Sequence, residues 1–391
     1  MKRHRPDLAL FGGPAAFAQP LHVGRPNIGD ASRFLARAAE ILERRWLTND
    51  GEYVREFEER VASLTGARHC VTTCNGTQAI ALCVRALGLE GDVILPSFTF
   101  VATAHALEWN GLVPVFCDID PRTHTLDPRR VEALITPRTS AILGVHLWGR
   151  PCAIEALSDI AARHGVPLVF DAAHAFACRD GGRMLGSCGR AEIFSFHATK
   201  IVNTFEGGAI LTSDDELAAR LRLSRNCGFQ GIDRVVSPGI NARMTEIAAA
   251  MGVTGLESLP DFLAANARNY EAYREGLGEI PGVDLFETGT SRAHVVAEVD
   301  AERAGITRDR LVDVLWAENV RARRYFHPGC HRQEPYRSRE PGAGARLPET
   351  ERVCERVLVL PTGTAVTPDD VATVCDVIRV AVRTSGSPRT A

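Results

Sequence analysis

A lysine and an aspartate, each at the end of an apolar run, are the residues of this sequence best suited to chemistry. Lys200 closes the segment FSFHATK (194–200), in which alternating aromatic residues lead into a polar group. Asp171 follows the apolar run 167–170. A desolvated lysine can form an imine with a carbonyl cofactor, although most lysines lie on the surface. A buried carboxylate needs a positive partner, although Asp171 could instead cap a helix.

One cofactor would suit both residues. The protonated pyridine nitrogen of pyridoxal phosphate would keep Asp171 ionised, and Asp171 would keep the ring protonated and electron-withdrawing. No GxGxxG motif follows the first strand, and no GxxxxGK[ST] motif is present. Both absences disfavour dinucleotide-dependent hydride transfer and P-loop phosphoryl transfer.

Two further segments follow predicted strands. Asn75-Gly76-Thr77 opens a helix, where free N–H groups and the helix dipole suit a phosphate, although Asn75 or Thr77 could simply cap that helix. Phe100, in PSFTF (96–100), could stack on a planar ring or could be an ordinary core residue.

The elements that would position these residues alternate between strands and helices. This alternation predicts βαβ crossovers and a mostly parallel seven-stranded sheet covered on both faces, whose strands carry ligands at their carboxyl ends. The predicted strands are 69–73, 92–96, 113–118, 141–146, 168–171, 193–196 and 208–212, and the predicted helices are 77–87, 99–109, 128–134, 153–163 and 214–225.

The remainder of the chain predicts a second unit. A long helical pattern runs from 245 to 277 with an interruption near Pro260, and a strand is expected at 292–299. We therefore predict a large domain at 20–260 and a smaller α+β domain at 261–391.

Composition limits the location and the partners. The net charge is −3 with no block of like charge, which disfavours a nucleic-acid partner, and no run approaches 18 apolar residues, which disfavours a membrane span. The 11 cysteines include no CxxC pair, so we predict reduced thiols, a cytoplasmic location and no metal site.

The motifs in their order resemble the DegT/DnrJ/StrS family of nucleotide-sugar aminotransferases, closest to its dTDP-4-keto-6-deoxyhexose 4-aminotransferases. The resemblance covers about residues 20 to 380. It implies the aspartate-aminotransferase fold (fold type I), pyridoxal 5'-phosphate as cofactor and a homodimer with composite sites. The matching segments are NGTQAI, PSFTFVATA, VHLWGRP, DAAHAFA, FSFHATK, EGGAILT and GINARMTEIAAAMG.

The resemblance also implies a role for each matching residue. Lys200 matches the Schiff-base lysine and Asp171 the residue at the pyridine nitrogen. His174 lies near the phenolic oxygen and Phe100 stacks on the ring. The phosphate would be held by Gly76, Thr77, Ser195 and, from the neighbouring subunit, Asn241.

Two positions depart from the family pattern: His174 stands where glutamine is common, and Phe205 takes the first place of a Gly-Glu-Gly-Gly loop, which should make that loop less flexible. A later segment, 323–336, resembles the sugar-nucleotide region, with Tyr325 and His331 as substrate-binding candidates; an ordinary basic loop is the alternative.

The resemblance implies transfer of an amino group, with glutamate as the expected donor, to a dTDP-4-keto-6-deoxyhexose at C4. Amination of a 3-keto-sugar at C3 is the alternative within the family. A non-catalytic regulatory or binding protein that kept the fold is the alternative outside it, and retention of both Lys200 and Asp171 disfavours that reading.

Overall fold

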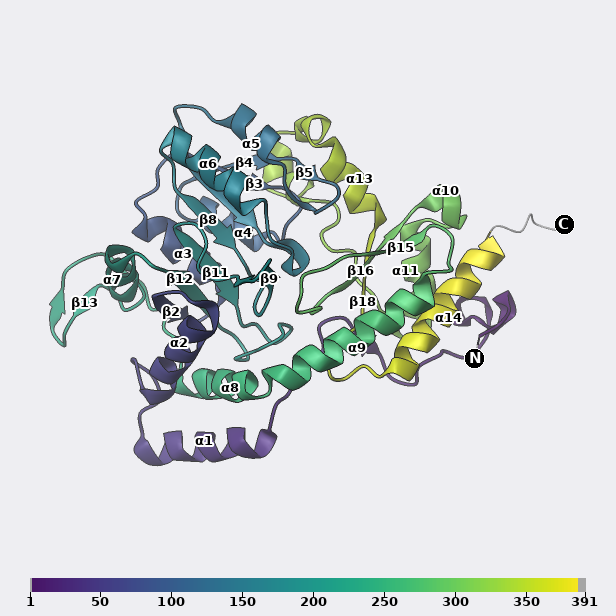
Figure 1. Cartoon of the computed structure of the whole chain (residues 1–391), viewed down its shortest axis with the longest axis horizontal. Helices are drawn as coiled ribbons and strands as arrows, with labels where there is room; N and C mark the ends of the chain where they lie inside the picture. The colour runs from purple at the N-terminus through teal and green to yellow at the C-terminus, as the bar shows by residue number, and fades with distance from the viewer. Residues whose placement is uncertain (1, 386–391) are drawn as a thin grey trace.

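A seven-stranded sheet forms the centre of the larger part of the molecule (Figure 1). The structure is a computed structural model that describes residues 2–385. In sheet order the strands are β2 (His69–Thr73), β12 (Gly208–Thr212), β11 (Ala191–Ser195), β8 (Leu168–Asp171), β7 (Thr139–Val145), β3 (Asp92–Pro96) and β4 (Val113–Cys117). Only β12 runs antiparallel to its neighbours, β2 and β11; the other adjacent pairs are parallel.

Helices cover both faces of this sheet, which explains its apolar strands. Val93, Ile94 and Leu95 are consecutive in β3 and all fully buried, as expected when both faces are covered. One face packs against α2 (Glu52–Thr65), α5 (Pro128–Leu134), α6 (Ile154–His164) and α8 (Glu246–Glu257), and the other against α3 (Gly76–Ala86), α4 (Ala102–Glu108) and α7 (Asp215–Ser224).

The predicted elements are confirmed with small shifts in their bounds. The helix expected from Thr99 begins at Ala102, because the chain first turns, with the Thr99 N–H donating to the Ser97 carbonyl at 3.0 Å. The long helical pattern is two helices, α8 and α9 (Leu259–Leu277). Pro260 lies in the first turn of α9, where a missing N–H costs nothing.

A second core forms around a three-stranded antiparallel sheet. The strand predicted at 292–299 begins only at Val295. Leu8 and Leu21 also pack in this core, so the N-terminal segment joins the second unit, whereas the sequence predicts a first domain that starts at residue 20. The elements are β15 (Val283–Phe286), β16 (Val295–Val299), β18 (Val357–Leu360), α10 (Ala301–Ala304), α11 (Arg308–Ala317) and α14 (Pro368–Ser385), with β1 (Leu21–His22) parallel to β17 (Val320–Arg321).

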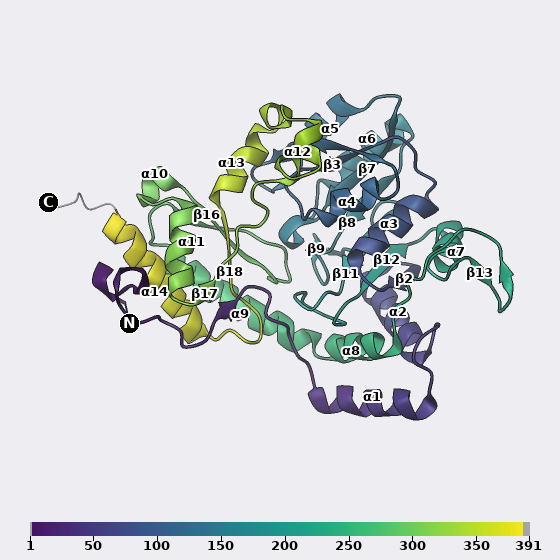
Figure 2. The same cartoon turned by 180° about the vertical axis from the view of Figure 1, so that it is seen from behind.

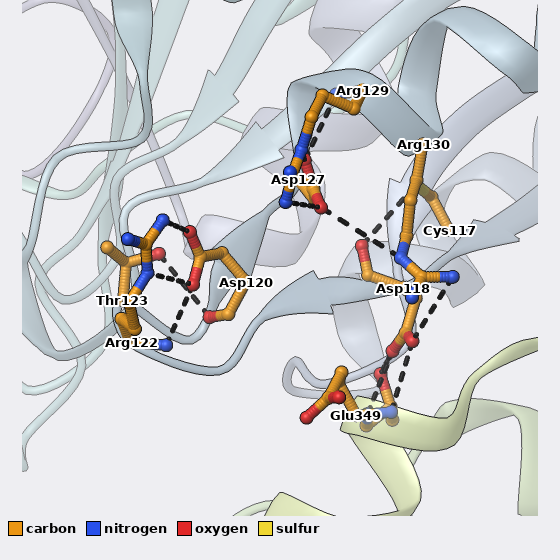
Figure 3. Close-up of polar contacts among 10 residues, drawn as sticks. Cys117, Asp118, Asp120, Arg122, Thr123, Asp127, Arg129, Arg130 and Glu349 are labelled. Atoms are coloured by element: carbon orange, nitrogen blue, oxygen red, sulfur yellow. Dashed lines mark hydrogen bonds and ion pairs between the residues drawn. The ribbon is translucent and has the colours of Figure 1, made fainter.

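A buried carboxylate ties the C-terminal part of the chain to the large sheet. Asp118 follows β4 and caps α13 (Pro348–Arg356), as Figure 3 shows. It accepts hydrogen bonds from Thr350 N and Oγ1, both at 2.8 Å, and from Glu349 N at 3.1 Å. Figure 2 shows α13 and α12 (Tyr336–Arg339) near β3, the second strand from the β4 end of the large sheet. The segment that joins them to β17, which includes residues 323–326, is therefore anchored at both ends.

The remaining elements are short or peripheral. Helix α1 (Ala31–Arg44) packs mainly along α8 and lies at the edge of the molecule (Figure 1). All 11 cysteines are free thiols, and among the described residues no group of three or more potential ligands could hold a metal ion. No helix within residues 2–385 is long and apolar enough to cross a membrane.

The short strands form three two-stranded pairs outside the two main sheets. These are β5 (Ile119–Asp120) with β6 (Thr125–Leu126), β9 (Arg179–Asp180) with β10 (Arg183–Met184), and β13 (Phe229–Gln230) with β14 (Arg234–Val235).

Candidate active site

A cavity of about 430 Å³ lies at the carboxyl ends of β8 and β11, where α3 begins. Parallel strands deliver their C-terminal residues to one edge, which is where α/β sheets bind ligands. The second unit closes the cavity through the segments 293–294, 323–326 and 359–363. Of the residues predicted from the sequence, the lining includes Gly76, Thr77, Phe100, Asp171, His174, Ser195, Lys200 and Tyr325.

Lys200 lies in the turn after β11, where its N–H donates to the His197 carbonyl at 2.9 Å. Burial lowers its pKa from 10.5 to about 8, and the charge of Asp171 opposes this shift. Its ammonium group has no hydrogen bond or ion pair with any residue of the described chain. The amine is therefore free to react, and with a pKa of about 8 roughly a tenth of it is neutral at pH 7, far more than for an ordinary lysine.

The sequence uses lysine only twice, at Lys2 and Lys200, although it has 45 lysines and arginines in total. Lys2 lies in the second unit, 3.1 Å from Glu318. Arginine serves nearly everywhere else as the cation, but its guanidinium group is never deprotonated in proteins. Position 200 is the one place at the cavity where a primary amine is present.

Asp171 is 5% exposed and ends β8. Its two oxygens accept hydrogen bonds from Thr103 Oγ1 at 2.8 Å and from the Ala173 N–H at 3.0 Å. Burial raises its pKa, and these two bonds and Lys200 oppose the rise. Both hydrogen-bond donors are neutral and Lys200 makes no ion pair with it, so a cationic ring nitrogen at this carboxylate would supply the missing charge.

The first turn of α3 forms a cradle beside Ser195. Asn75 caps the helix, with its side chain accepting a hydrogen bond from Gln78 N at 2.8 Å. A capping role for Asn75 and a phosphate site at the first turn of the helix are therefore compatible. A Cβ at Gly76 would lie 3.1 Å from the Ser195 Cβ, which means that glycine allows this close approach. The helix N-terminus and the Ser195 hydroxyl together suit a phosphate.

His174 and Phe100 complete the predicted group. Phe100 is 58% exposed on the cavity, which leaves its ring free to stack on a planar ligand. His174 Nδ1 is buried without a hydrogen-bond partner, and burial lowers the pKa of this imidazole well below its usual value. The amine, the buried carboxylate, the phosphate cradle and the orphaned imidazole fit pyridoxal phosphate in every part.

Two predicted residues lie outside the cavity lining. His331 is buried, with Nδ1 2.6 Å from Ser97 Oγ and Nε2 2.7 Å from Glu351 Oε1, so both ring nitrogens are occupied within the protein. Asn241 is exposed and forms a β-bridge with Asn226. Neither residue is brought to the cavity of its own chain.

In the loop after Lys200, Phe205 stands where the family often has the first glycine of a Gly-Glu-Gly-Gly sequence. Phe205 has a φ of 62°, in the left-handed region that bulky residues rarely adopt. Its ring is held by an edge contact with Phe34 of α1, with centroids 5.7 Å apart. The structure thus accommodates phenylalanine where the family often has glycine.

One cavity residue was missed in the sequence. His294 precedes β16 and lies with its ring centroid 4.2 Å from that of His174. The missed signal is weak, since a single histidine before a strand in the second unit has no spacing that connects it with position 174.

Comparisons with known proteins agree with this geometry. The model of the DegT/DnrJ/EryC1/StrS aminotransferase family matches residues 29–379. A dTDP-4-amino-4,6-dideoxy-D-glucose transaminase of Shigella dysenteriae is 34% identical over 367 residues, covering 92% of this chain and 99% of the relative. A GDP-perosamine synthase of Caulobacter vibrioides is 38% identical over 307 residues, with 76% and 82% covered. The crystal structure of DesI in the presence of its TDP-sugar product has a TM-score of 0.93 and 53% identity, with 97% of each chain covered.

Proposed function

The chain belongs to the DegT/DnrJ/EryC1/StrS aminotransferase family, and from this premise we propose that it aminates a keto-sugar carried on a nucleotide. It is a pyridoxal-phosphate-dependent aminotransferase of the aspartate-aminotransferase fold. One observation carries the proposal: Lys200, Asp171 and the first turn of α3 line a single cavity. A binding protein would have no use for this combination.

Each of these residues has a defined task. Pyridoxal phosphate, when bound, supplies an aldehyde and a ring that absorbs the negative charge left at the amino donor's α-carbon. Lys200 would bond to the aldehyde and, once released, move a proton at its Nζ as general base and then acid. Asp171 would hold a proton on the ring nitrogen, and Ser195 with Gly76 and Thr77 would hold the phosphate.

For the acceptor we propose a dTDP-4-keto-6-deoxyhexose aminated at C4, with glutamate as the donor. The names of the relatives support a 4-amino sugar on a nucleotide. The cavity rim supports an anionic ligand, because Arg25 and Arg323 line it and neither guanidinium group has an ion pair with another described residue. Unpaired arginines at a rim suit a diphosphate. Amination at C3 is the competing outcome of the test.

The test combines an assay and a labelling experiment. Purified enzyme is incubated with glutamate and either the 4-keto or the 3-keto dTDP-sugar, and the position of the new amine is determined by NMR. Borohydride should bleach the visible band and fix the cofactor on one peptide. With only Lys2 and Lys200 in the chain, mass spectrometry separates the candidates unambiguously. A label on Lys2, or no amination of either sugar, would refute the proposal.

We also propose a homodimer with composite sites. Asn241 is exposed and lies outside its own cavity, so it could reach a cofactor phosphate only in another subunit. Helix α1 and the residues after it expose large apolar side chains, at Leu35 (64%), Leu42 (68%) and Trp46 (57%). An apolar surface of this kind supports self-association, and a two-fold interface would pair both sites.

Subunit mixing tests this assembly. An Asn241→Ala chain is mixed with a Lys200→Ala chain. If Asn241 acts across the interface, one site of the mixed dimer carries both changes and the other carries neither, so activity returns towards that of one intact site. If Asn241 acts within its own chain, each site keeps one lesion and mixing adds nothing. A fully active monomer on sizing would also refute the dimer.

A further inference from the structure

His294 is a cavity residue that the cofactor roles above do not use. It immediately precedes β16, and the first residue of that strand, Val295, is fully buried in the second core. The His294 carbonyl accepts a hydrogen bond from Thr288 Oγ1 at 3.0 Å. The Ser291 carbonyl, three residues earlier, accepts one from Asn266 Nδ2 at 3.2 Å. The backbone that carries His294 is therefore held on two sides, and the side chain has a defined position.

Other rings also hold the imidazole in place. Its centroid lies 4.2 Å from that of His174 and 5.7 Å from that of the fully buried Trp148. Trp148 in turn stacks on Phe326 at 5.6 Å, with an interplanar angle of 7°. His294 and Phe326 both line the cavity, so these rings form an aromatic wall to which the large domain and the second unit each contribute two rings.

Within this wall the ring nitrogens of His294 lack partners. Nδ1 is buried and has no hydrogen-bond partner, and no described residue bonds to the imidazole at either nitrogen. A buried polar group without a partner costs stability and calls for an explanation, and because His294 lines the cavity, a bound ligand is the explanation that its position favours. The observation points to a ligand atom that occupies this position when the site is filled.

The chemistry of the imidazole narrows the choice of ligand atom. Burial and the charge of Lys200 lower the His294 pKa to about 3, so the ring is neutral and offers one donor and one acceptor. A neutral imidazole suits an alcohol or a carbonyl better than a phosphate or a carboxylate, which call for arginine. His294 also comes from the second unit, whereas Gly76, Asp171, Ser195 and Lys200 come from the large sheet and its helices.

We propose that His294 hydrogen-bonds an oxygen substituent of the hexose and so helps the site to recognise the sugar rather than the nucleotide. This inference rests on the proposed function, because it takes a sugar nucleotide as the ligand. His294 would be the sugar-facing member of the histidine pair, with His174 on the cofactor side.

The test measures binding to the cofactor-loaded enzyme by calorimetry, with dTDP-glucose and dTDP as probes. Neither probe has a keto or amino group on a sugar, so no turnover interferes. The variants are His294→Phe, which removes both nitrogens, and His294→Asn, whose amide can occupy the Nδ1 position. His105→Phe is the matched control, because His105 Nε2 is also buried without a partner but His105 does not line the cavity.

We expect His294→Phe to weaken dTDP-glucose binding roughly tenfold and to leave dTDP binding unchanged, as for the loss of one hydrogen bond to a ligand. His294→Asn should recover part of the loss, and His105→Phe should behave as the unchanged enzyme. Unaltered dTDP-glucose binding in His294→Phe, equal weakening of both probes, or a changed visible spectrum without a loss of sugar affinity would each overturn the inference. If the unchanged enzyme binds neither probe, the proposed function itself has failed.

Discussion

Replacing Lys200 with methionine should stabilise the protein without its cofactor while abolishing turnover. The Lys200 pKa is lowered from 10.5 to about 8 by burial, and each pKa unit corresponds to about 1.4 kcal/mol. Near pH 7 both the folded and the unfolded chain are protonated at this position, so the folded apoenzyme carries a penalty of up to about 3 kcal/mol. Methionine fills a similar volume without a charge and removes that penalty.

The pH dependence has a definite sign. Between pH 8 and about 10.5 the unfolded chain keeps the proton that the folded chain has lost, so the unchanged apoenzyme gains stability as pH rises. The advantage of Lys200→Met should therefore be largest below about pH 8 and shrink by about 2 kcal/mol up to about pH 9.5. The measurement is denaturant unfolding of both apoproteins at equal concentration over this pH range. Taking their difference cancels the titration of the other groups.

Lys2→Met is the matched control and should change stability in the opposite direction. Lys2 pairs at 3.1 Å with Glu318, whose side chain is fully buried. Removing the cation leaves that carboxylate with only the N–H groups of Ala9 and Ala16, which should cost about 1–3 kcal/mol. The reasoning fails if Lys200→Met is no more stable than the unchanged apoenzyme near pH 7, or if its advantage does not depend on pH.

Three further predictions concern the same structure. The rate at which apoenzyme takes up pyridoxal phosphate should rise with pH, with the midpoint of the rise near pH 8. Asp171→Asn should lower that midpoint, because Asp171 raises the Lys200 pKa. A midpoint near pH 10 in the unchanged enzyme would contradict the lowered pKa. Gly76→Ala should weaken cofactor binding measurably by equilibrium dialysis, because its Cβ would lie 3.1 Å from that of Ser195, and unchanged affinity would remove the cradle. His331→Phe should lower stability by about 2 kcal/mol in urea unfolding while the KM for the sugar nucleotide stays nearly constant, and the reverse pattern would restore His331 as a substrate residue.

The large sheet and its chemistry could be predicted because the signals are local. Strands such as 92–96 and 168–171 are apolar runs buried on both faces, and they end at polar residues. A carboxylate directly after such a run, as at Asp171, has few uses other than a cap or a site. The structure shows that it is not a cap for a regular helix, since only one backbone N–H, that of Ala173, donates to it.

The contacts that close the cavity could not be predicted, because they join positions far apart in the chain. His331 has a residue type that suits either a substrate or a core hydrogen bond, and only the fold reveals that Ser97, 234 positions earlier, takes one of its nitrogens. The ring contact between His174 and His294 likewise spans two units. Neither contact leaves a periodicity or a spacing in the sequence, because both contacts depend on how the second core packs against the large sheet.

The distribution of lysine links composition to mechanism. Lysine and arginine both provide a cation for surface pairs, so a chain can use arginine almost everywhere without loss, as this one does. Only an amine that loses its proton near neutral pH can attack an aldehyde or carry a proton, and arginine cannot. Lys200→Arg keeps the charge but neither ability, so a lysine at this cavity is required for the reaction itself. The burial that lowers its pKa is the same feature that destabilises the empty site, which makes the two effects inseparable at position 200.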